Sequence, residues 1–246
     1  MLNILIPLAG PTPFFDSSEY PFPKPLIEIR GKPMVEHVIT NLKTIEAEKR
    51  FIFLLRDHDC SRFHLDETVR LLAGEDAVIL KIKGETKGSV CSVLLAVDFI
   101  DNNETLLISN GDQLFEHGIS ERVLALSRDD IDGGCLVFES VHPRWSYVRI
   151  EGDRKIVEAS EKRPISKNAI AGIYVFRRGS DFVKGAKEAI RKDANVGGAY
   201  YVSAVLNELV LMNRSFCAVP VPNEDYVTFY SPQKIAEYEA AVRLWK

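Results

Sequence analysis

The stretch LNILIPLAG, residues 2–10, is a short and nearly continuous apolar run that ends in Ala9-Gly10. Such a run is typical of a strand that is buried on both faces of a parallel sheet. After Pro33, which suits the first turn of a helix, apolar side chains recur at three- and four-residue intervals through residues 35–42. The beginning of the chain therefore predicts a strand, a proline-rich loop and a helix.

The same alternation of strand and helix continues to about residue 110. Further strands are expected at 50–56, 77–82 and 105–110, with helices between them at 61–73 and 89–99. Repeated strand–helix units of this length favour right-handed crossovers, which build a mostly parallel sheet.

After about residue 130 the pattern changes to strand-like runs separated by turn residues, which is closer to antiparallel pairing. These runs lie at 133–140, 145–151, 155–160 and 169–177. The remaining elements expected are a strand at 215–221 and helices at 180–192, 201–212 and 232–244. The sequence therefore predicts a single α/β domain over residues 1–246, with a mixed, mostly parallel central sheet flanked by helices.

The composition argues against several classes of protein. The 246 residues are 46% hydrophobic and 27% charged, as in ordinary globular domains, and the net charge of −4 does not favour a nucleic-acid surface. Four cysteines, at 60, 91, 135 and 217, form no CxxC pair, so neither a zinc site nor a disulfide framework is predicted. No apolar run approaches the ~20 residues that cross a bilayer, and the first residues show no cationic leader. We expect a cytoplasmic protein with no membrane and no nucleic-acid partner.

Asp112 follows the strand expected at 105–110, in the Gly-containing stretch SNGDQLFE. Ligands of open α/β sheets bind beyond the carboxyl ends of the strands, and Mg²⁺ is usually held by one or two carboxylates together with phosphate oxygens. Asp112 is therefore a candidate metal ligand. The alternative is that its side chain only caps the turn or helix that follows.

Lys24 lies between two prolines in PFPKPLIEI. Proline fixes its own φ and pushes the preceding residue out of the helical region, so we expect Lys24 to be held in an extended segment. A rigidly mounted ammonium group suits a phosphate that must be met at a fixed point. The alternative is a surface turn with a solvated lysine.

Six pieces of the sequence, in this order, resemble the sugar-phosphate nucleotidylyltransferases, also called nucleoside-diphosphate-sugar pyrophosphorylases. They are LAG at 8–10, PKPL at 23–26, GKPMVEHVI at 31–39, SNGDQLFE at 109–116, EKRPIS at 161–166 and NAIAGIYVF at 168–176. The pieces HPRWSYV at 142–148 and YYVSAVLNELV at 200–210 are similar to a short branch often found with capsule or surface-polysaccharide genes. The resemblance covers almost the whole chain.

The resemblance implies a Rossmann-like nucleotidyltransferase domain that needs Mg²⁺. An oxygen of a sugar phosphate or related phosphate ester attacks the α-phosphorus of a nucleoside triphosphate, and pyrophosphate leaves in line. Residues 1–130 would bind the nucleotide, and residues 131–246 would bind the phosphorylated small molecule. Alignment and charge neutralisation matter more in such a step than covalent help from the protein.

The resemblance also implies roles for particular residues. Lys24 and Asp112 would be catalytic, with Asp112 holding the metal. The nucleotide would be bound by these two residues together with Leu8, Ala9, Gly10, Thr86 and Gly88. The phosphorylated substrate would be bound by Glu161, Lys162, Asn168 and Gly172.

The sequence departs from the family in the loop after the first strand. The family has a run like G-x-G-[ST]-R there, whereas this chain has Gly10-Pro11-Thr12-Pro13-Phe14. Two prolines remove two N–H donors, and Phe14 stands where an arginine would neutralise the leaving pyrophosphate. Arg30 and Lys32 are the nearest cations that could reach over.

A second departure lies in DYVTFYSP at 225–232. Thr228 stands near the position where many family members place a second metal-binding aspartate, and Asp225 and Glu224 lie three and four residues upstream. Neither carboxylate is assigned as a ligand.

Three functions stay open at this point. The first is an active nucleotidyltransferase, and the second is a catalytically lapsed nucleotide or nucleotide-sugar binding protein of the same fold. The third is a glycosyltransferase on a related fold, although such enzymes commonly present D-x-D to the metal and this chain has Gly111-Asp112-Gln113. The sequence leaves open the base, the phosphorylated substrate and whether the protein forms a homo-oligomer.

Overall fold

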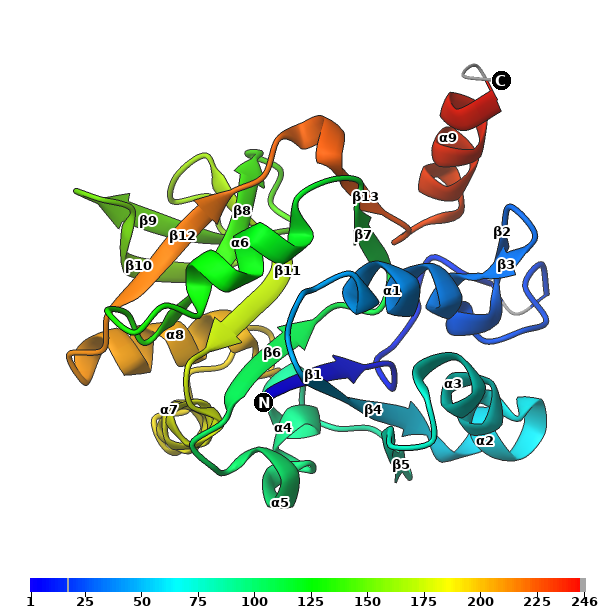
Figure 1. Cartoon of the computed structure of the whole chain (residues 1–246), viewed down its shortest axis with the longest axis horizontal. Coiled ribbons are helices and arrows are strands. Elements are labelled where there is room, and N and C mark those ends of the chain that lie inside the picture. The colour runs from blue at the N-terminus through cyan, green and yellow to red at the C-terminus, as the bar shows by residue number, and fades with distance from the viewer. Residues whose placement is uncertain (17, 244–246) are drawn as a thin grey trace.

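A nine-stranded mixed sheet runs through the protein in the strand order β5-β4-β1-β6-β11-β8-β12-β10-β9 (Figure 1). The computed structural model describes residues 1–16 and 18–243. The predicted α/β domain with a mixed central sheet flanked by helices is confirmed.

The first half of the sheet is parallel. Its strands are β1 (Leu2–Pro7), β4 (Lys49–Arg56), β5 (Val78–Ile82) and β6 (Thr105–Ser109). Ile4, Leu5 and Ile6 are all fully buried, so successive side chains on both faces of β1 lie in the core. The continuous apolar run in the sequence reflects this burial on two faces.

The second half of the sheet is joined to the first by antiparallel pairing of β11 (Asn168–Phe176) with β6. β11 is also antiparallel to β8 (Gly133–Glu139). Strand β10 (Lys155–Glu161) is antiparallel to β9 (Ser146–Glu151) and to β12 (Phe216–Pro220), whereas β12 runs parallel to β8. The change of pattern near residue 130 therefore marks a real change in strand pairing.

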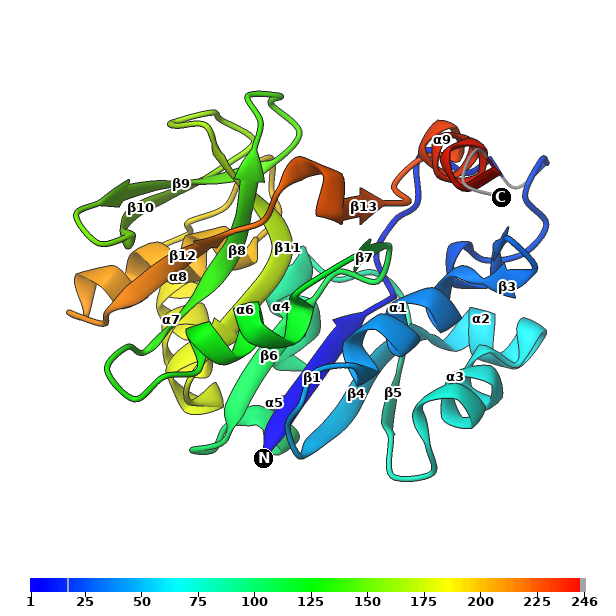
Figure 2. The same cartoon turned by 45° about the horizontal axis from the view of Figure 1, so that its top comes forward.

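Helices cover both faces of the sheet. On one face, the buried side chains of α1 (Met34–Lys43), α2 (Asp57–Phe63), α3 (Leu65–Ala73) and α6 (Ile119–Leu126) share one apolar core; Figure 2 shows α1 and α6 over this face. On the other face, the second core contains buried side chains of α4 (Ser89–Leu94), α5 (Val97–Ile100), α7 (Gly179–Arg191) and α8 (Val202–Leu211). None of the helices in the described ranges has the length and hydropathy of a membrane span.

Several short elements build a smaller cluster at one end of the sheet. They are the 3₁₀ helices η1 (Lys24–Leu26) and η2 (Asn223–Asp225), the antiparallel pairs β2 (Glu28–Ile29) with β3 (Lys32–Pro33) and β7 (Gln113–Phe115) with β13 (Tyr226–Thr228), and α9 (Pro232–Arg243). Ile29, Met34, Leu114 and Phe229 are buried together there with Ile235 of α9. Figure 1 shows α9 beside the β2–β3 hairpin.

Some predicted helices differ from those observed. The helix predicted at 61–73 is two helices, because His64 adopts a left-handed conformation, with φ of 53°, between α2 and α3. The helix predicted at 89–99 is divided between α4 and α5 at Ala96, whose φ of −95° and ψ of 15° are not helical. The end of the helix predicted at 232–244 lies outside the described residues.

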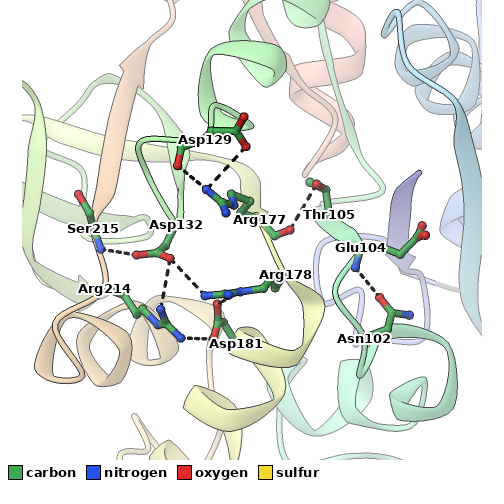
Figure 3. Close-up of polar contacts among 10 residues, drawn as sticks. All are labelled: Asn102, Glu104, Thr105, Asp129, Asp132, Arg177, Arg178, Asp181, Arg214 and Ser215. Atoms are coloured by element: carbon green, nitrogen blue, oxygen red, sulfur yellow. Dashed lines mark hydrogen bonds and ion pairs between the residues drawn. The ribbon is translucent and has the colours of Figure 1, made fainter.

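A cluster of ion pairs fixes the edge of the sheet where β8 and β12 begin (Figure 3). Asp181 of α7 is almost fully buried and is held by Arg178 Nε and Arg214 Nη2, each at 2.9 Å. Asp132 lies within 3.6 Å of the same two guanidinium groups and accepts a hydrogen bond from the Ser215 backbone N–H. The cluster ties α7 to the segments that precede β8 and β12, and we assign it a structural role.

Candidate active site

A pocket of about 260 Å³ lies beyond the carboxyl ends of β1 and β6. We call it the β1–β6 pocket. Its walls include Gly10 and Thr12 from the loop after β1, Lys24 from η1, and Asn110 and Asp112 from the loop after β6. Two segments about a hundred residues apart meet here because their parallel strands are adjacent in the sheet. This is the position where open α/β sheets bind their ligands.

Lys24 and Asp112 form the one side-chain ion pair among the described residues that line this pocket. Lys24 Nζ lies 2.5 Å from Asp112 Oδ2, and the two side chains are 14% and 23% exposed. The Lys24 ammonium group also lies 5.2 Å from the centre of the Phe15 ring. Both groups are therefore partly shielded from water while they remain open to a ligand in the pocket.

The backbone at Lys24 differs from the prediction. Lys24 does not lie in an extended segment but begins the one-turn helix η1, in which the Leu26 N–H donates to Pro23 O and the Ile27 N–H to Lys24 O. Pro25 fits the first turn of such a helix because the N–H that proline lacks would have no partner there. The lysine is nevertheless firmly mounted, between extended Pro23 and buried Pro25.

The alternative reading of Asp112 as a cap is not what the structure shows. Among the described residues, its carboxylate accepts a hydrogen bond from Lys24 and none from a backbone N–H. Its backbone oxygen accepts hydrogen bonds from the Phe229 N–H at 2.7 Å and from Thr228 Oγ1 at 3.4 Å. The β13 segment thus fixes the loop that carries Asp112.

The carboxylate of Asp112 would suit a Mg²⁺ ion that takes its other ligands from phosphate oxygens and water. Among the described residues, no group of three or more His, Cys, Asp or Glu side chains could hold a metal ion without further ligands. Asp225, considered above as an offset second ligand, pairs with Arg122 at 2.9 Å and does not line the β1–β6 pocket. Asp112 alone, supplemented by phosphate oxygens and water, is a donor set that Mg²⁺ accepts.

The carbonyl groups of the loop after β1 accept hydrogen bonds from an arginine of the protein itself. Arg56, at the end of β4, donates to Ala9 O from Nε at 3.0 Å and to Gly10 O from Nη2 at 2.5 Å. The Phe15 N–H donates to Thr12 O, which closes a turn around Pro13 and Phe14. The sequence did not single out Arg56, because an arginine at the end of a strand has no pattern of its own.

The two cations considered as replacements for the missing arginine lie elsewhere. Lys32 pairs with Glu36 at 2.7 Å on α1, and neither Lys32 nor Arg30 lines the β1–β6 pocket. That suggestion is not supported by the positions of these side chains.

Thr86 and Gly88 lie in the loop before α4. Thr86 Oγ1 is 2.6 Å from Ser92 Oγ and donates to Gly88 O, so the loop is closed by its own hydrogen bonds. Gly88 has a φ of 98°, and a Cβ there would clash with the backbone of Tyr200, whose N–H donates to Lys87 O. This glycine is required by close packing, and its contact with a base stays a prediction.

Glu161 and Lys162 lie at the end of β10, and their side chains diverge. Glu161 Oε2 accepts hydrogen bonds from Ser146 Oγ and from Ser203 Oγ, the latter at 2.9 Å. Burial raises the pKa of Glu161 above its usual value, opposed by these two hydroxyl groups and by Lys162. Lys162 donates to the Tyr201 hydroxyl at 2.8 Å, and this bond is the main reason that its own pKa is raised.

Gly172 and Asn168 lie on the same strand, β11, but their neighbours in the fold differ. Gly172 has a φ of 63° at the irregularity in the β8–β11 pairing, and a Cβ there would clash with Gln113 and Asn110. Its carbonyl accepts a hydrogen bond from the Asn110 N–H, which places it against the loop after β6. Asn168 instead lines a separate pocket with Glu139 and Glu224. The structure therefore brings Gly172, and not Asn168, to the edge of the Asp112 loop.

Gln113 is a further polar side chain at this edge that sequence reasoning missed. It is 2% exposed, and its Oε1 accepts a hydrogen bond from the Tyr226 hydroxyl at 3.1 Å, while its Nε2 is buried without a partner among the described residues. It follows Asp112 directly, and its neighbours Gly172 and Tyr226 come from distant parts of the chain. Only the fold reveals this contact.

The family model described as nucleotidyl transferase matches residues 20–200, which span both sides of the pocket and include Lys24, Asp112 and Glu161. This chain belongs to the nucleotidyl transferase family. The predicted family is thereby confirmed, and the match favours nucleotidyl transfer over the glycosyltransferase alternative.

Curated relatives of this nucleotidyl transferase include two named Bifunctional protein GlmU. The one from Thermotoga maritima is 29% identical over 192 residues, which are 75% of this chain and 40% of that protein. The one from Methanocaldococcus jannaschii is 27% identical over 157 residues, which are 63% of this chain and 35% of that protein. The chain thus spans between about a third and about a half of the length of the curated relatives that it matches.

Solved structures show the same fold. A nucleoside-diphosphate-sugar pyrophosphorylase from Vibrio cholerae superposes with a TM-score of 0.83 at 23% identity, covering 96% of this chain and 99% of that one. A UDP-glucose pyrophosphorylase complexed with UDP-glucose superposes with a TM-score of 0.78 at 14% identity, covering 99% of each chain. At these identities the likeness shows the fold of the nucleotidyl transferase alone.

Proposed function

We propose that this protein transfers a nucleoside monophosphate from a nucleoside triphosphate to a sugar phosphate or related phosphate ester and releases pyrophosphate. The observation that carries the proposal is the Lys24–Asp112 pair in the β1–β6 pocket, at the carboxyl edge of a nucleotidyl transferase fold. In the reaction, an oxygen of the substrate phosphate forms a bond to the α-phosphorus. The bond from that phosphorus to the bridging oxygen breaks, and pyrophosphate leaves with the electron pair.

The protein's own groups bind and align the two phosphates. Lys24 exchanges its contact with Asp112 for phosphate oxygens of the nucleotide, which removes negative charge where the leaving group develops it. Asp112 would hold Mg²⁺, which supplies charge stabilisation and orients the phosphates when it is bound. Holding the attacking oxygen in line with the leaving group lowers the barrier through orientation.

The second half of the chain supplies the groups for the phosphate ester. Glu161 has one carboxylate oxygen, Oε2, held by two serine hydroxyls, and its Oε1 has no hydrogen bond among the described residues. Lys162 directly follows strand β10, and Gly172 lies on strand β11 of this half. We therefore assign residues 1–130 to the nucleotide and residues 131–246 to the phosphorylated small molecule, with Asn168 in a peripheral position.

Release of pyrophosphate tests this proposal. The purified protein is incubated with Mg²⁺, each nucleoside triphosphate and a panel of sugar phosphates and other phosphate esters. We expect pyrophosphate from one combination, and its loss in Asp112→Asn. No pyrophosphate from any combination would overturn the proposal.

A catalytically lapsed binding protein is the second candidate, favoured by the loop after β1. Pro11 and Pro13 carry no N–H, and the position of the family's arginine is taken by Phe14, whose side chain is 54% exposed. Arg56 donates its hydrogen bonds to the loop's own carbonyl groups. Under this reading, Phe14→Arg would raise turnover strongly from a low level. Efficient turnover by the wild type would exclude it.

A further inference from the structure

Arg144, in the loop between β8 and β9, lies against three aromatic rings. Its guanidinium carbon is 3.3 Å from the centre of the Tyr230 ring, 5.4 Å from that of Phe14 and 5.3 Å from that of Trp145. Phe14 and Trp145 each meet Tyr230 edge-on, with ring centres 6.0 Å apart. Three segments far apart in the sequence therefore surround one guanidinium group, which we call the Arg144 stack.

The Arg144 stack is built partly from two segments that also reach the β1–β6 pocket or its Asp112 loop. Phe14 lies two residues after Thr12, which lines the pocket. Tyr230 directly follows Phe229, whose N–H donates to Asp112 O at 2.7 Å. The stack is thus one residue from the backbone contact that fixes the Asp112 loop.

Tyr226 supports this placement. Burial is the main cause of the raised pKa of its hydroxyl; Asp112 raises that pKa further, and Arg144 lowers it. Both charges therefore act on the same hydroxyl group, which also donates to Gln113. Trp145 of the stack also packs edge-on against the Tyr226 ring, with ring centres 6.2 Å apart.

Arg144 is a cation near the pocket that has no carboxylate partner among the described residues. Lys24 is neutralised by Asp112, Arg56 is bound to loop carbonyls, and Lys32 is paired with Glu36. Among the ion pairs of the described residues, Arg144 takes part in none. A nucleoside triphosphate carries several negative charges, which a neutral Lys24–Asp112 pair does not balance.

We propose that Arg144 binds the triphosphate of the nucleotide, and that Phe14, Trp145 and Tyr230 hold its guanidinium group at the pocket edge. This inference rests on the proposed function and adds a phosphate-binding residue from the second half of the chain. A guanidinium group stacks on aromatic rings through its face and donates to phosphate oxygens through its edge, so both contacts can exist together. The stack also restricts the side chain before binding, which lowers the entropy lost when the nucleotide is bound.

The binding test compares Arg144→Gln and Arg144→Lys with the wild type and with Arg128→Gln, which removes an exposed arginine between α6 and β8. The dissociation constants of each nucleoside triphosphate and of the matching monophosphate are measured by titration calorimetry with Mg²⁺. For Arg144→Gln we expect triphosphate affinity to fall about 10- to 100-fold, the usual effect of losing a charged hydrogen bond. Monophosphate affinity should stay close to that of the wild type, Arg144→Lys should lie between, and Arg128→Gln should match the wild type.

A second variant checks the position of the guanidinium group. Phe14 is half-exposed and touches Arg144, so Phe14→Arg placed in the Arg144→Gln background offers a guanidinium group to the same phosphates. We expect this double variant to recover most of the lost triphosphate affinity. Recovery would not follow from a merely structural role of Arg144.

Two outcomes overturn the inference in different ways. Equal triphosphate affinity in Arg144→Gln and the wild type, or an equal loss for triphosphate and monophosphate, overturns the role of Arg144 alone. No binding of any nucleoside triphosphate to the wild type overturns the proposed function and this inference with it. Arg144→Lys keeps the test decisive if Arg144→Gln does not fold.

Discussion

The proposed chemistry of this protein depends on two residues, Lys24 and Asp112. The sequence indicated both: a lysine between two prolines and an aspartate after a buried strand. What the sequence could not give is that each is the other's partner, because 88 positions separate them and only the adjacency of β1 and β6 brings them together. In the pair the two charges neutralise each other. In the proposed complex Lys24 would pair with phosphate oxygens, and Asp112 would hold Mg²⁺.

Replacing Lys24 tests this role at the level of one residue. We expect Lys24→Gln to lower the rate of pyrophosphate release by about 10²- to 10³-fold, the usual effect of losing one preorganised charge-stabilising group. The matched control is Lys81→Gln, which removes an ion pair with Asp66 at 2.6 Å on the surface. Steady-state kinetics with the identified substrates provide the measurement, and a rate loss of similar size in both variants would contradict a specific role for Lys24.

Glu161 gives a prediction about pH. Burial raises its pKa in the folded protein, so the protonated carboxyl is favoured by folding. Its stabilising contribution is complete below the unfolded pKa near 4.5 and is lost as the pH rises through the raised folded pKa. Glu161→Gln should therefore gain stability relative to the wild type as the pH rises from 4 to 7. Urea unfolding of both proteins across this range measures the difference, and a constant difference would refute the prediction.

At the scale of elements, long periodic segments were predictable and short ones were not. The strands and helices that carry a full apolar pattern lie where the sequence places them. The pairs β2–β3 and β7–β13 contain two or three residues per strand, which is too short for any period to show. β13 nevertheless matters for the site, because Thr228 at its end and the following Phe229 hold the Asp112 loop.

Gly172 tests the irregular part of β11. An alanine there would have to adopt a φ of 63° and would clash with Gln113 and Asn110. Gly152→Ala is the matched control, since Gly152 has a φ of 52° with nothing within 4 Å of an added Cβ. The left-handed conformation alone costs about 1–2 kcal/mol. Gly172→Ala should lose more stability than the control in denaturant unfolding; equal losses would show that the contacts with Gln113 and Asn110 contribute nothing.

Asp181 tests the ion cluster at the opposite edge of the sheet. Removing one partner of a buried ion pair typically destabilises a protein by about 3–5 kcal/mol, because a charge is left without compensation. We expect Asp181→Ala to cost less than this value but more than loss of an exposed pair, since both arginines lose a buried partner and keep Asp132. Asp130→Ala, which breaks the exposed pair with Arg128, should change the free energy of unfolding by less than about 1 kcal/mol. Similar effects of the two variants in urea unfolding would argue against the proposed anchoring of α7.

At the scale of the whole molecule, the two kinds of strand pairing correspond to the two proposed ligands. The parallel half carries Lys24 and Asp112 for the nucleotide, and the second half carries Glu161 and Lys162 for the phosphate ester. Arg144 is the exception, because it belongs to the second half and is proposed to bind the triphosphate. The fold class could be predicted from the change in pattern near residue 130, whereas the division of labour came from the resemblance to the family and stays a prediction. Arg144 could not be found in either way, since its position depends on three loops that meet only in the folded protein.

The central claim, that the β1–β6 pocket binds a nucleoside triphosphate, is tested most directly by thermal unfolding. The wild type and Asp112→Ala are heated with each nucleoside triphosphate, with and without Mg²⁺. A ligand at about 100 times its Kd stabilises the folded state by roughly 2.7 kcal/mol, so binding is visible before the second substrate is known. We predict a Mg²⁺-dependent rise in Tm for one base that is lost in Asp112→Ala. No rise with any nucleotide, or an equal rise in both proteins, would contradict the account.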